Sequence, residues 1–369
     1  MRLGWADFVE RHPDGTVFQS PEMYELFAKS RRMKPVVIGL YDEDSGSIKG
    51  ILQAVIIREM KGLAGYFSSR TVIYGGPLVE TGGKGDKGKG RKGDGETGRR
   101  GEEGMVLHML LEELIRQVKN HSIFIQFRNF NSQEENKALF SKYSFHHRDR
   151  LNLIVDTTSR ETVIKNMSAS RWRQIRKGLG VGRVDKETRR QGEEGKRGDE
   201  YAKITEPENI DQVRDFYDIL FNLYKYKVKK PLPAWDFFEQ FYHISRESRL
   251  GIIRLVQYKG KIIGGILSPV TPGKTIYEWY VCGLDQQYKE VHPSVLATWA
   301  AIEYAVENDI PRFDFMGVGI PEREYGVREF KSRFGGEQLN FGRFARVNNR
   351  IFYFAAETGY NLLALLKKI

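Results

Sequence analysis

The chain has 369 residues, of which 40% are hydrophobic and 12% aromatic, so it is long enough to build two domains with buried cores. Its formal net charge of +11 predicts attraction to a polyanion such as tRNA, a nucleotide-linked substrate or an anionic membrane surface, and does not choose among them. The chain contains no apolar run of roughly 20 residues, no signal-peptide pattern and one cysteine, Cys282, which excludes an internal disulfide. These features predict a soluble, cytoplasmic protein without a transmembrane segment.

The N-terminal half is rich in predicted strands and is interrupted by one unusual segment. Residues 81–104 contain no aromatic or aliphatic side chain and consist mainly of Gly, Lys, Arg, Asp and Glu. Such a segment cannot bury enough apolar surface to offset its ordering entropy, so we predict a disordered Gly/Lys-rich insertion. A stripe of leucines predicts a helix over 105–119. Strands are predicted over residues 36–40, 48–55, 70–74 and 123–127.

The C-terminal half repeats this order. Once residues 81–104 are left out, the spacing from Gly50 to Phe127 closely matches that from Gly265 to Phe315. This match indicates two copies of one mixed α/β unit. The predicted elements are strands over residues 251–256, 262–267, 275–281 and 312–315, with a helix over 293–307 before the last strand.

Several antiparallel strands followed by a helix and a further strand is the order of the acetyltransferase (GNAT) fold. We therefore predict an α+β protein of two tandem GNAT-like domains, residues 1–155 and 156–369, each a mixed sheet flanked by helices. The second domain is predicted to be the catalytic one, because no disordered Gly/Lys-rich insertion precedes its helix.

The remaining segments are predicted to be mainly helical. Helices are clearest over residues 162–177 and 207–226, and a second charged, glycine-bearing stretch at 185–200 resembles the first insertion. The leucine-bearing residues 355–368 predict a closing helix that serves as core or interface rather than as a membrane anchor.

Common catalytic and metal motifs are missing from the sequence. It has no Walker loop, HExxH, GxSxG or paired CxxC, and Cys282 has no neighbouring cue for activation. These absences weaken ATPase, zinc protease, serine hydrolase and zinc-finger interpretations. Acyl transfer remains open, because it needs no covalent nucleophile or metal, only an amine held against an activated carbonyl, polarisation of that carbonyl and a path for the proton.

Four segments together carry a family resemblance. They are residues 313–317 (Phe-Asp-Phe-Met-Gly), 325–337, 171–177 and 18–20 (Phe-Gln-Ser). On these residues the chain resembles the FemAB/FemX family of peptidoglycan-bridge aminoacyltransferases, which are built from tandem GNAT-like domains. The resemblance implies an aminoacyl-tRNA donor, a nucleotide- or lipid-linked muropeptide acceptor and no bound cofactor.

Four residues are predicted to be catalytic. By resemblance, Lys331 binds a phosphate or steadies negative charge on the acyl carbonyl; otherwise it is a solvated lysine in a basic turn. Asp314 is either a desolvated base, or a structural residue that accepts backbone hydrogen bonds or pairs with Arg328. Glu278 and Tyr280 lie two apart on a predicted strand, hence on one face, where they act on the amine and orient the acceptor, or form surface pairs.

Two basic clusters are predicted to bind phosphates. In the first, Arg173, Arg176 and Lys177 project together at helical spacing. By resemblance, this cluster matches the arginine-rich helix with which the second domain of the family begins. In the second, Lys225 and Lys227 alternate with Tyr224 and Tyr226. By resemblance, this cluster lies where the family binds the diphosphate of its acceptor. A solvated charged face is the alternative for each. The predicted substrate-binding residues are Lys29, Arg171, Arg173, Arg176, Lys225, Lys227 and Phe330.

The turn at residues 285–293 precedes the helix on whose amides acetyltransferases cradle the donor's pyrophosphate, but it lacks their Arg/Gln-x-x-Gly-x-Gly/Ala motif. The sequence thus predicts aminoacyl transfer from aminoacyl-tRNA to an amine of a peptidoglycan stem peptide. The alternatives are an acyl-CoA-dependent N-acyltransferase acting on a cell-envelope sugar or lipid precursor, and a non-catalytic RNA-binding protein with the same fold.

Overall fold

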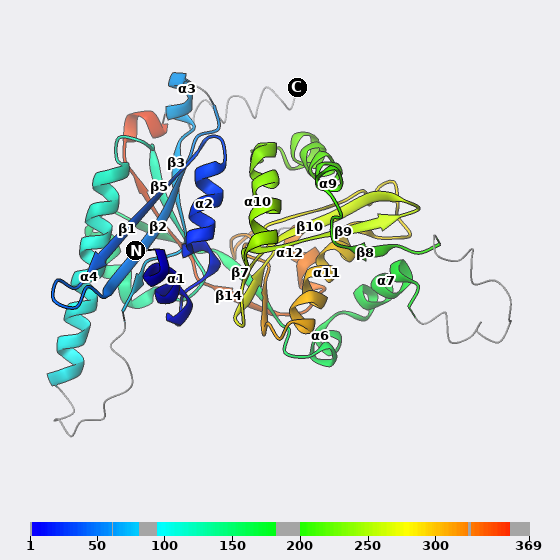
Figure 1. Cartoon of the computed structure of the whole chain (residues 1–369), viewed down its shortest axis with the longest axis horizontal. Coiled ribbons are helices and arrows are strands. Elements are labelled where there is room, and N and C mark those ends of the chain that lie inside the picture. Colours follow the sequence, from blue (N-terminus) through cyan, green and yellow to red (C-terminus); the bar gives the residue numbers. More distant parts are fainter. Residues whose placement is uncertain (1, 61, 81–93, 182–199, 324–325, 355–369) are drawn as a thin grey trace. The chain divides into compact units, whose positions relative to one another are not determined.

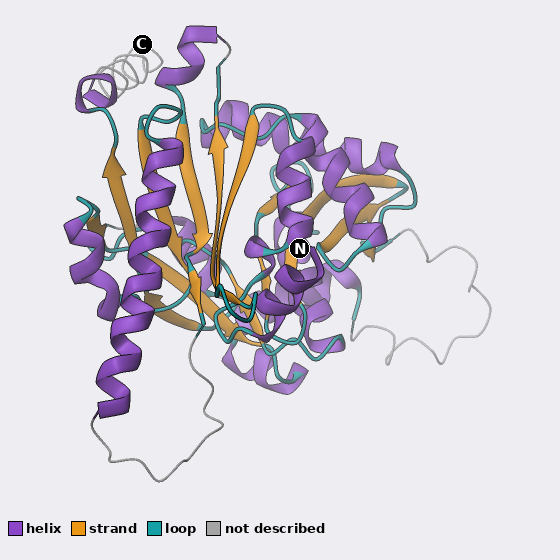
Figure 2. Ribbon diagram, turned by 60° about the vertical axis from the view of Figure 1, so that its left-hand side comes forward, coloured by secondary structure: helices purple, strands orange, loops and turns teal. Residues whose placement is uncertain are grey.

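The computed structural model describes residues 2–60, 62–80, 94–181, 200–323 and 326–354. The chain divides into two compact units, Met1–Asp149 with Phe341–Ile369, and Arg150–Asn340. Each unit contains one mixed sheet with helices against it (Figures 1 and 2). The predicted α+β class with two mixed sheets flanked by helices is confirmed.

The first unit has a sheet in the order β1-β2-β3-β5-β15-β6, with β4 paired to β2. Neighbouring strands are antiparallel except β3 and β5, which are parallel. Its strands are β1 (Met33–Tyr41), β2 (Ile48–Ile57), β3 (Arg70–Gly75), β4 (Leu78–Val79), β5 (Phe124–Asn129), β6 (His146–Arg148) and β15 (Arg343–Val347). Its helices are α1 (Arg2–Arg11), α2 (Pro21–Lys29), α3 (Gly62–Phe67), α4 (Asp94–Val118) and α5 (Lys137–Lys142).

Alternation along β2 explains why helices cover both faces of this sheet. Leu52 belongs to the cluster that buries the leucine stripe of α4, whereas Ile51 packs with Phe8 of α1.

Helix α4 also corrects a prediction, because it begins at Asp94, so the predicted disorder is wrong for residues 94–104. Glu102 on this extension forms an ion pair with Lys49 of β2 at 3.7 Å, a contact that composition alone does not indicate.

The second unit has a sheet in the order β14-β7-β13-β11-β10-β9-β8, with β12 paired to β10. Its strands are β7 (Leu151–Asp156), β8 (Lys203–Thr205), β9 (Gly251–Tyr258), β10 (Lys261–Thr271), β11 (Thr275–Tyr277), β12 (Tyr280–Gly283), β13 (Arg312–Asp314) and β14 (Glu337–Asn340). Its helices are α6 (Arg160–Asn166), α7 (Ala169–Leu179), α9 (Ile210–Leu223), α10 (Trp235–Glu247), α11 (Pro293–Glu307) and α12 (Gly326–Ser332).

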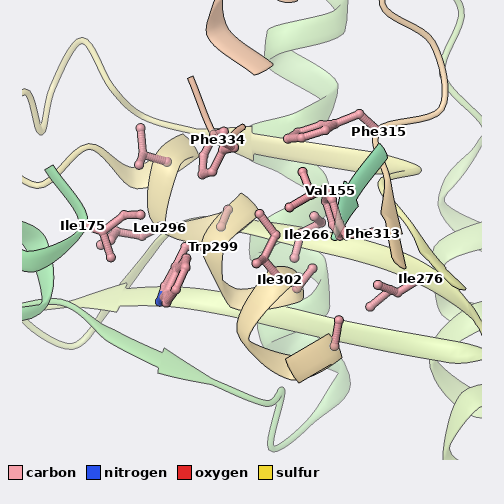
Figure 3. Packing of buried hydrophobic residues seen from close by; sticks show 14 of the residues in the cluster. Val155, Ile175, Ile266, Ile276, Leu296, Trp299, Ile302, Phe313, Phe315 and Phe334 are labelled. Carbon is pink, nitrogen blue, oxygen red and sulfur yellow. The ribbon is translucent and has the colours of Figure 1, made fainter. Parts of the chain in front are cut away.

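Adjacent glycines of β10 show how closely helices approach the two faces of this sheet. A Cβ on Gly264 would lie 3.3 Å from Pro293 of α11, and one on Gly265 would lie 2.9 Å from Phe216 of α9. On the α11 side, aliphatic and aromatic side chains from the helix, the sheet and α7 form the main core (Figure 3). Trp299 of α11 is fully buried in this core.

The two sheets repeat one topology, and each takes a strand from a distant part of the chain. The parallel pair β3 and β5 corresponds to β11 and β13, with α4 and α11 as the connecting helices. Strand β15 then pairs with β5, and β7 pairs with β13. The division therefore differs from the predicted boundary between residues 155 and 156: β7 lies in the second unit and residues 341–354 lie in the first.

The local predictions differ from the structure mainly where a cap or a break interrupts an element. The predicted helix over 162–177 is two helices, because Ser168 caps α7 by accepting a hydrogen bond from Arg171 N. The predicted strand over 275–281 is broken after Tyr277. Residues 81–93, 185–199 and 355–368 of the other predictions lie outside the described residues. Within the described ranges no helix is long and apolar enough to cross a membrane.

Gly283 provides a test of the packing between β12 and α11. A Cβ at this position would lie 2.2 Å from the backbone nitrogen of Ser294, and a helix backbone cannot move aside as a flexible side chain can. We expect Gly283→Ala to lower the free energy of unfolding by about 1–3 kcal/mol, measured by chemical denaturation. Gly326→Ala, where a Cβ meets nothing within 4 Å, should change it by less than about 1 kcal/mol. Equal effects of the two changes would contradict this packing.

Candidate active site

The sheet of the second unit opens where two parallel strands part. Strands β11 and β13 are paired at Tyr277 and Asp314, and Glu278 N still donates to Asp314 O at 2.9 Å. Beyond this point β12 stays with β10, whereas Phe315 N donates to Leu153 O of the opposite neighbour, β7. The backbones on the two sides of the opening therefore bond to different strands. Peptide groups that face the opening can bond to side chains instead of across it.

A lysine from α12 occupies this opening. The Lys331 ammonium donates to Phe315 O at 2.9 Å on one side and pairs with Glu278 Oε1 at 2.8 Å on the other. The second carboxylate oxygen of Glu278 accepts from Thr298 Oγ1 of α11 at 3.2 Å. The Lys331 and Glu278 side chains are only 12% and 3% exposed, so this is a nearly dry ion pair whose remaining hydrogen bonds are supplied by the protein.

Asp314 lies beside this pair and is fully buried. Its Oδ1 accepts from Met316 N at 2.6 Å, and its Oδ2 accepts from Asn152 Nδ2 at 3.1 Å. Burial raises the pKa of Asp314 to about 6, against these hydrogen bonds and the nearby Lys331 charge, which lower it. Arg328, the partner considered from the sequence, donates instead to the carbonyls of residues 318, 320 and 321. Asp314 is thus an acceptor held by backbone and amide donors.

The predicted pairing of Glu278 with Tyr280 on one face is wrong. Glu278 meets Thr298 of α11, but the Tyr280 ring packs against Phe238 of α10 with centroids 5.3 Å apart, on the other side of the sheet. The alternation fails because the break between β11 and β12 falls at Glu278 and Trp279. Lys331, Glu278 and Asp314 come together, and Tyr280 does not join them.

The N-terminus of α11 already carries an anion of the protein. The carboxylate of Asp285 accepts the Ser294 amide at 3.0 Å, at the second residue of the helix. Thr298 follows Ser294 by about one turn of α11, so this terminus and the ion pair are roughly 6 Å apart along the helix. Where acetyltransferases offer free amides to a pyrophosphate, this chain has a carboxylate.

Helix α7 brings the arginine cluster to the start of α11. A Cβ on Gly178 would lie 2.6 Å from Val291 O, so the two segments are in close contact, and Lys177 pairs with Glu290. Arg173 and Arg176 are exposed on α7. These two arginines are available to an external anion beside the helix terminus.

Arg171 has a different place from the one predicted. It is only 2% exposed, donates to Phe330 O at 2.8 Å and lies 4.4 and 4.5 Å from the ring centroids of Phe330 and Phe334. Burial lowers its pKa to about 10. Arg171 and Phe330 therefore tie α7 to α12 and position Lys331, whereas the sequence predicted that both bind substrate.

The other predicted binding residues lie apart from the ion pair. Lys225 and Lys227 are exposed on a π-helical turn, Tyr224–Val228. The Tyr224 ring is tilted against that of Tyr280, with centroids 6.4 Å apart. Lys29 belongs to the first unit and pairs with Glu25 on the surface of α2. Burial raises the pKa of Cys282, which contacts Phe216 O and is no activated nucleophile.

A cavity of about 700 Å³ lies elsewhere in the second unit. It is lined by the end of α10, the start of β9 and the end of α11, and none of Lys331, Glu278 and Asp314 reaches it. Among the described residues no group of three His, Cys, Asp or Glu side chains could hold a metal ion.

Three polar residues of the site were missed by sequence reasoning: Asn152, Asp285 and Thr298. Asn152 stands between Leu151 and Leu153 on β7, far from Asp314 in the chain, and Thr298 lies within an apolar helix. A polar residue in an apolar element is a weak signal, since most such residues satisfy themselves locally. The signal for Asp285 was stronger, because this aspartate begins the turn that leads to Pro293, a proline typical of the first residue of a helix.

Asp314 generates a pH prediction. Its pKa is raised from about 3.8 to about 6, so its contribution to stability is present below about pH 4 and is lost as pH rises through 6. Relative to Asp314→Asn, the native protein should lose on the order of 2–3 kcal/mol of unfolding free energy between about pH 4 and 7. Asp156→Asn is the control. Hydrogen bonds from Thr158 lower the pKa of Asp156, so its pH effect has the opposite sign; the same sign for both would contradict the prediction.

Comparisons with known proteins bear on the fold and on part of the second unit. Residues 182–332 match the family model of the acetyltransferase (GNAT) domain. A crystal structure of FemX is similar to this chain with a TM-score of 0.65 and 14% identity. The similar region covers 96% of this chain and 98% of the FemX chain. No curated protein matches the chain in sequence.

Two further structures are similar at lower scores. One is the C-terminal domain of a putative lysylphosphatidylglycerol synthetase from Agrobacterium fabrum, with a TM-score of 0.49 and 12% identity over 98% of this chain and 95% of that one. The other is a tandem GNAT protein from the clavulanic acid biosynthesis pathway, with a TM-score of 0.46 and 10% identity over 91% and 96%. The FemX likeness shows the fold, and the family match shows that residues 182–332 are similar to the acetyltransferase (GNAT) domain.

Proposed function

We propose that this protein transfers an aminoacyl group from aminoacyl-tRNA to an amine of a peptidoglycan precursor stem peptide. The observation that carries the proposal is the Lys331 ammonium held between the parting strands by Phe315 O and Glu278. It is a fixed positive charge in a nearly dry position, at the place where the GNAT sheet opens. Such a charge suits the stabilisation of an oxyanion.

The reaction uses this charge without a covalent intermediate. The neutral amine attacks the ester carbonyl, the new N–C bond forms, and the C–O bond to the tRNA ribose breaks as the amine's proton passes to the leaving ribose oxygen. Lys331 stabilises the negative charge on the carbonyl oxygen. Glu278 and Arg171 act through Lys331, by fixing its ammonium and the helix that carries it.

The start of α11 supports tRNA over coenzyme A as the donor. Asp285 already bonds to the Ser294 amide, so a pyrophosphate approaching this helix terminus meets a negative charge. The exposed Arg173 and Arg176 on the adjoining α7 suit the more widely spaced phosphates of an RNA strand.

The acceptor would approach on the other side of the sheet. The exposed Lys225 and Lys227 follow Tyr224, which is the neighbour of Tyr280. Two lysines beside tyrosine rings suit a diphosphate linked to a sugar or nucleotide. This places Lys225 and Lys227 as acceptor-binding residues in the proposal.

The transfer is tested by mass spectrometry of a nucleotide-linked muropentapeptide incubated with the purified protein and either a pool of aminoacylated tRNAs or acetyl-CoA. We expect an amino-acid increment with the tRNA pool, and Lys331→Met should lower its rate by about 100-fold or more. An acetyl increment would move the protein to the acyl-CoA-dependent group. Tight tRNA binding without either increment would favour the non-catalytic alternative.

Loss of folding is separated from loss of chemistry by a second variant. Lys331→Met alone leaves the Glu278 carboxylate buried without its partner, which costs about 3–5 kcal/mol. The double variant Lys331→Met with Glu278→Met removes both charges and should recover much of that stability without recovering transfer. Activity that returns together with the melting temperature would make the pair purely structural.

Asp285 generates a prediction about donor choice. Asp285→Asn keeps an acceptor for the Ser294 amide and removes the negative charge, so the affinity for coenzyme A should rise roughly five- to tenfold, measured by titration calorimetry. Asp211→Asn, in the first turn of α9, is the control and should change nothing. Tight coenzyme A binding by the native protein, or no gain in the Asp285 variant, would contradict a role for this carboxylate in excluding the cofactor.

A further inference from the structure

One end of the sheet in the first unit exposes an apolar cluster. Its most exposed members are Ile351 at 79% and Phe354 at 71%, followed by Met60 at 50%, Phe67 at 37% and Phe352 at 36%. The surfaces of soluble proteins rarely expose so many large apolar side chains in one patch. We call these five residues the apolar cluster.

The apolar cluster is continuous although it comes from two distant segments. The Phe352 ring lies 5.1 Å from Phe67 and 5.6 Å from Tyr66, which joins residues 350–354 to α3. Tyr353 packs against Phe124 of β5 at 5.9 Å and anchors this turn to the sheet. Figure 1 shows α3 and the turn at residues 350–354 beyond the same end of the sheet, and Figure 2 shows both from another side.

Positively charged residues lie beside the apolar cluster. Residues 31–32, 58–60, 62–67 and 350–354 contain four arginines, Arg31, Arg32, Arg58 and Arg350, and one acid, Glu59. Glu59 is paired with Arg70, and the formal net charge of these ranges is positive. Arg32 reaches the same loop by donating to Glu59 O at 2.7 Å.

We propose that this surface docks the protein on an anionic lipid bilayer. The side chains of the apolar cluster would enter the boundary between headgroups and acyl chains, and Arg32, Arg58 and Arg350 would meet the lipid phosphates. Exposed aromatic and aliphatic side chains rimmed by arginines are the pattern that binds such a boundary, since neither apolar contact nor charge alone is sufficient for stable binding. Docking does not depend on Lys331 and goes beyond the proposed transfer reaction.

The cluster has the geometry of a shallow anchor. Ile351 and Phe354 bury little surface within the protein, so their exposure is not required by the fold of the sheet. Tyr66 and Tyr353 hold the segment from beneath. Because the support and the exposed side chains are different residues, the exposed ones can be changed without removing the support.

Docking is tested by sedimentation of the full chain with vesicles of phosphatidylcholine alone or mixed with phosphatidylglycerol. We expect binding to the mixed vesicles that falls with salt, and little to phosphatidylcholine. The double variant Ile351→Ser with Phe354→Ser, and separately Arg58→Glu with Arg350→Glu, should each weaken it at least tenfold. Tyr41→Ser and Arg11→Glu are the controls and should not: Tyr41 is 48% exposed at the far end of β1, and Arg11 is exposed at the end of α1.

Insertion has its own readout, because Cys282 is 2% exposed and will not compete for a thiol dye. A polarity-sensitive dye on Ile351→Cys should shift to the blue on mixed vesicles, whereas the same dye on Tyr41→Cys should not. Three results would overturn the proposal. They are vesicle binding unaffected by both double variants, binding that requires residues 355–369 while the apolar cluster is dispensable, and a dimer that the Ile351 and Phe354 changes dissociate without any vesicle binding.

Discussion

The second unit depends on how it fills the gap that opens when two parallel strands part. Beyond Tyr277 and Asp314, β12 follows β10 and the residues after β13 follow β7, so the sheet can no longer satisfy Phe315 O. The Lys331 ammonium supplies the missing donor and carries a positive charge into the interior. That charge is stable there only because Glu278 neutralises it and Thr298 satisfies the carboxylate.

Contacts of Arg171 and Asp314 support the region around this lysine. Arg171 stacks between Phe330 and Phe334 and bonds to Phe330 O, one residue before Lys331. Asn152 Nδ2 and Met316 N donate to the carboxylate of Asp314, the last residue of β13. In the proposed function these contacts have a second consequence, because a buried charge that is to polarise a substrate carbonyl must first be stable without substrate.

Under the proposed function, the carboxylate at the start of α11 is what distinguishes an aminoacyl-tRNA donor from coenzyme A. Helix α11 begins with Pro293 and lies within residues 182–332, which match the acetyltransferase (GNAT) domain model. One carboxylate, Asp285, occupies the amide where an acetyltransferase would bind pyrophosphate. Function in such a fold is set by a few side chains at the opening, whereas the fold itself persists at 14% identity.

The sequence by itself determined the elements whose signals are local: α11 from Pro293 to Glu307, the hairpin of β9 and β10, the internal repeat, and Lys331 and Glu278 as residues of interest. Only the tertiary structure decided which distant segments pair, namely β15 with β5 and β7 with β13. It also revealed the break in the strand at Glu278 and the packing of Tyr280 against Phe238, away from Glu278. It also converted Arg171 from a predicted phosphate ligand into a buried support. The reason is that periodicity reports which face of one element is apolar, whereas pairing, desolvation and the partner of a charge depend on residues far away in the chain.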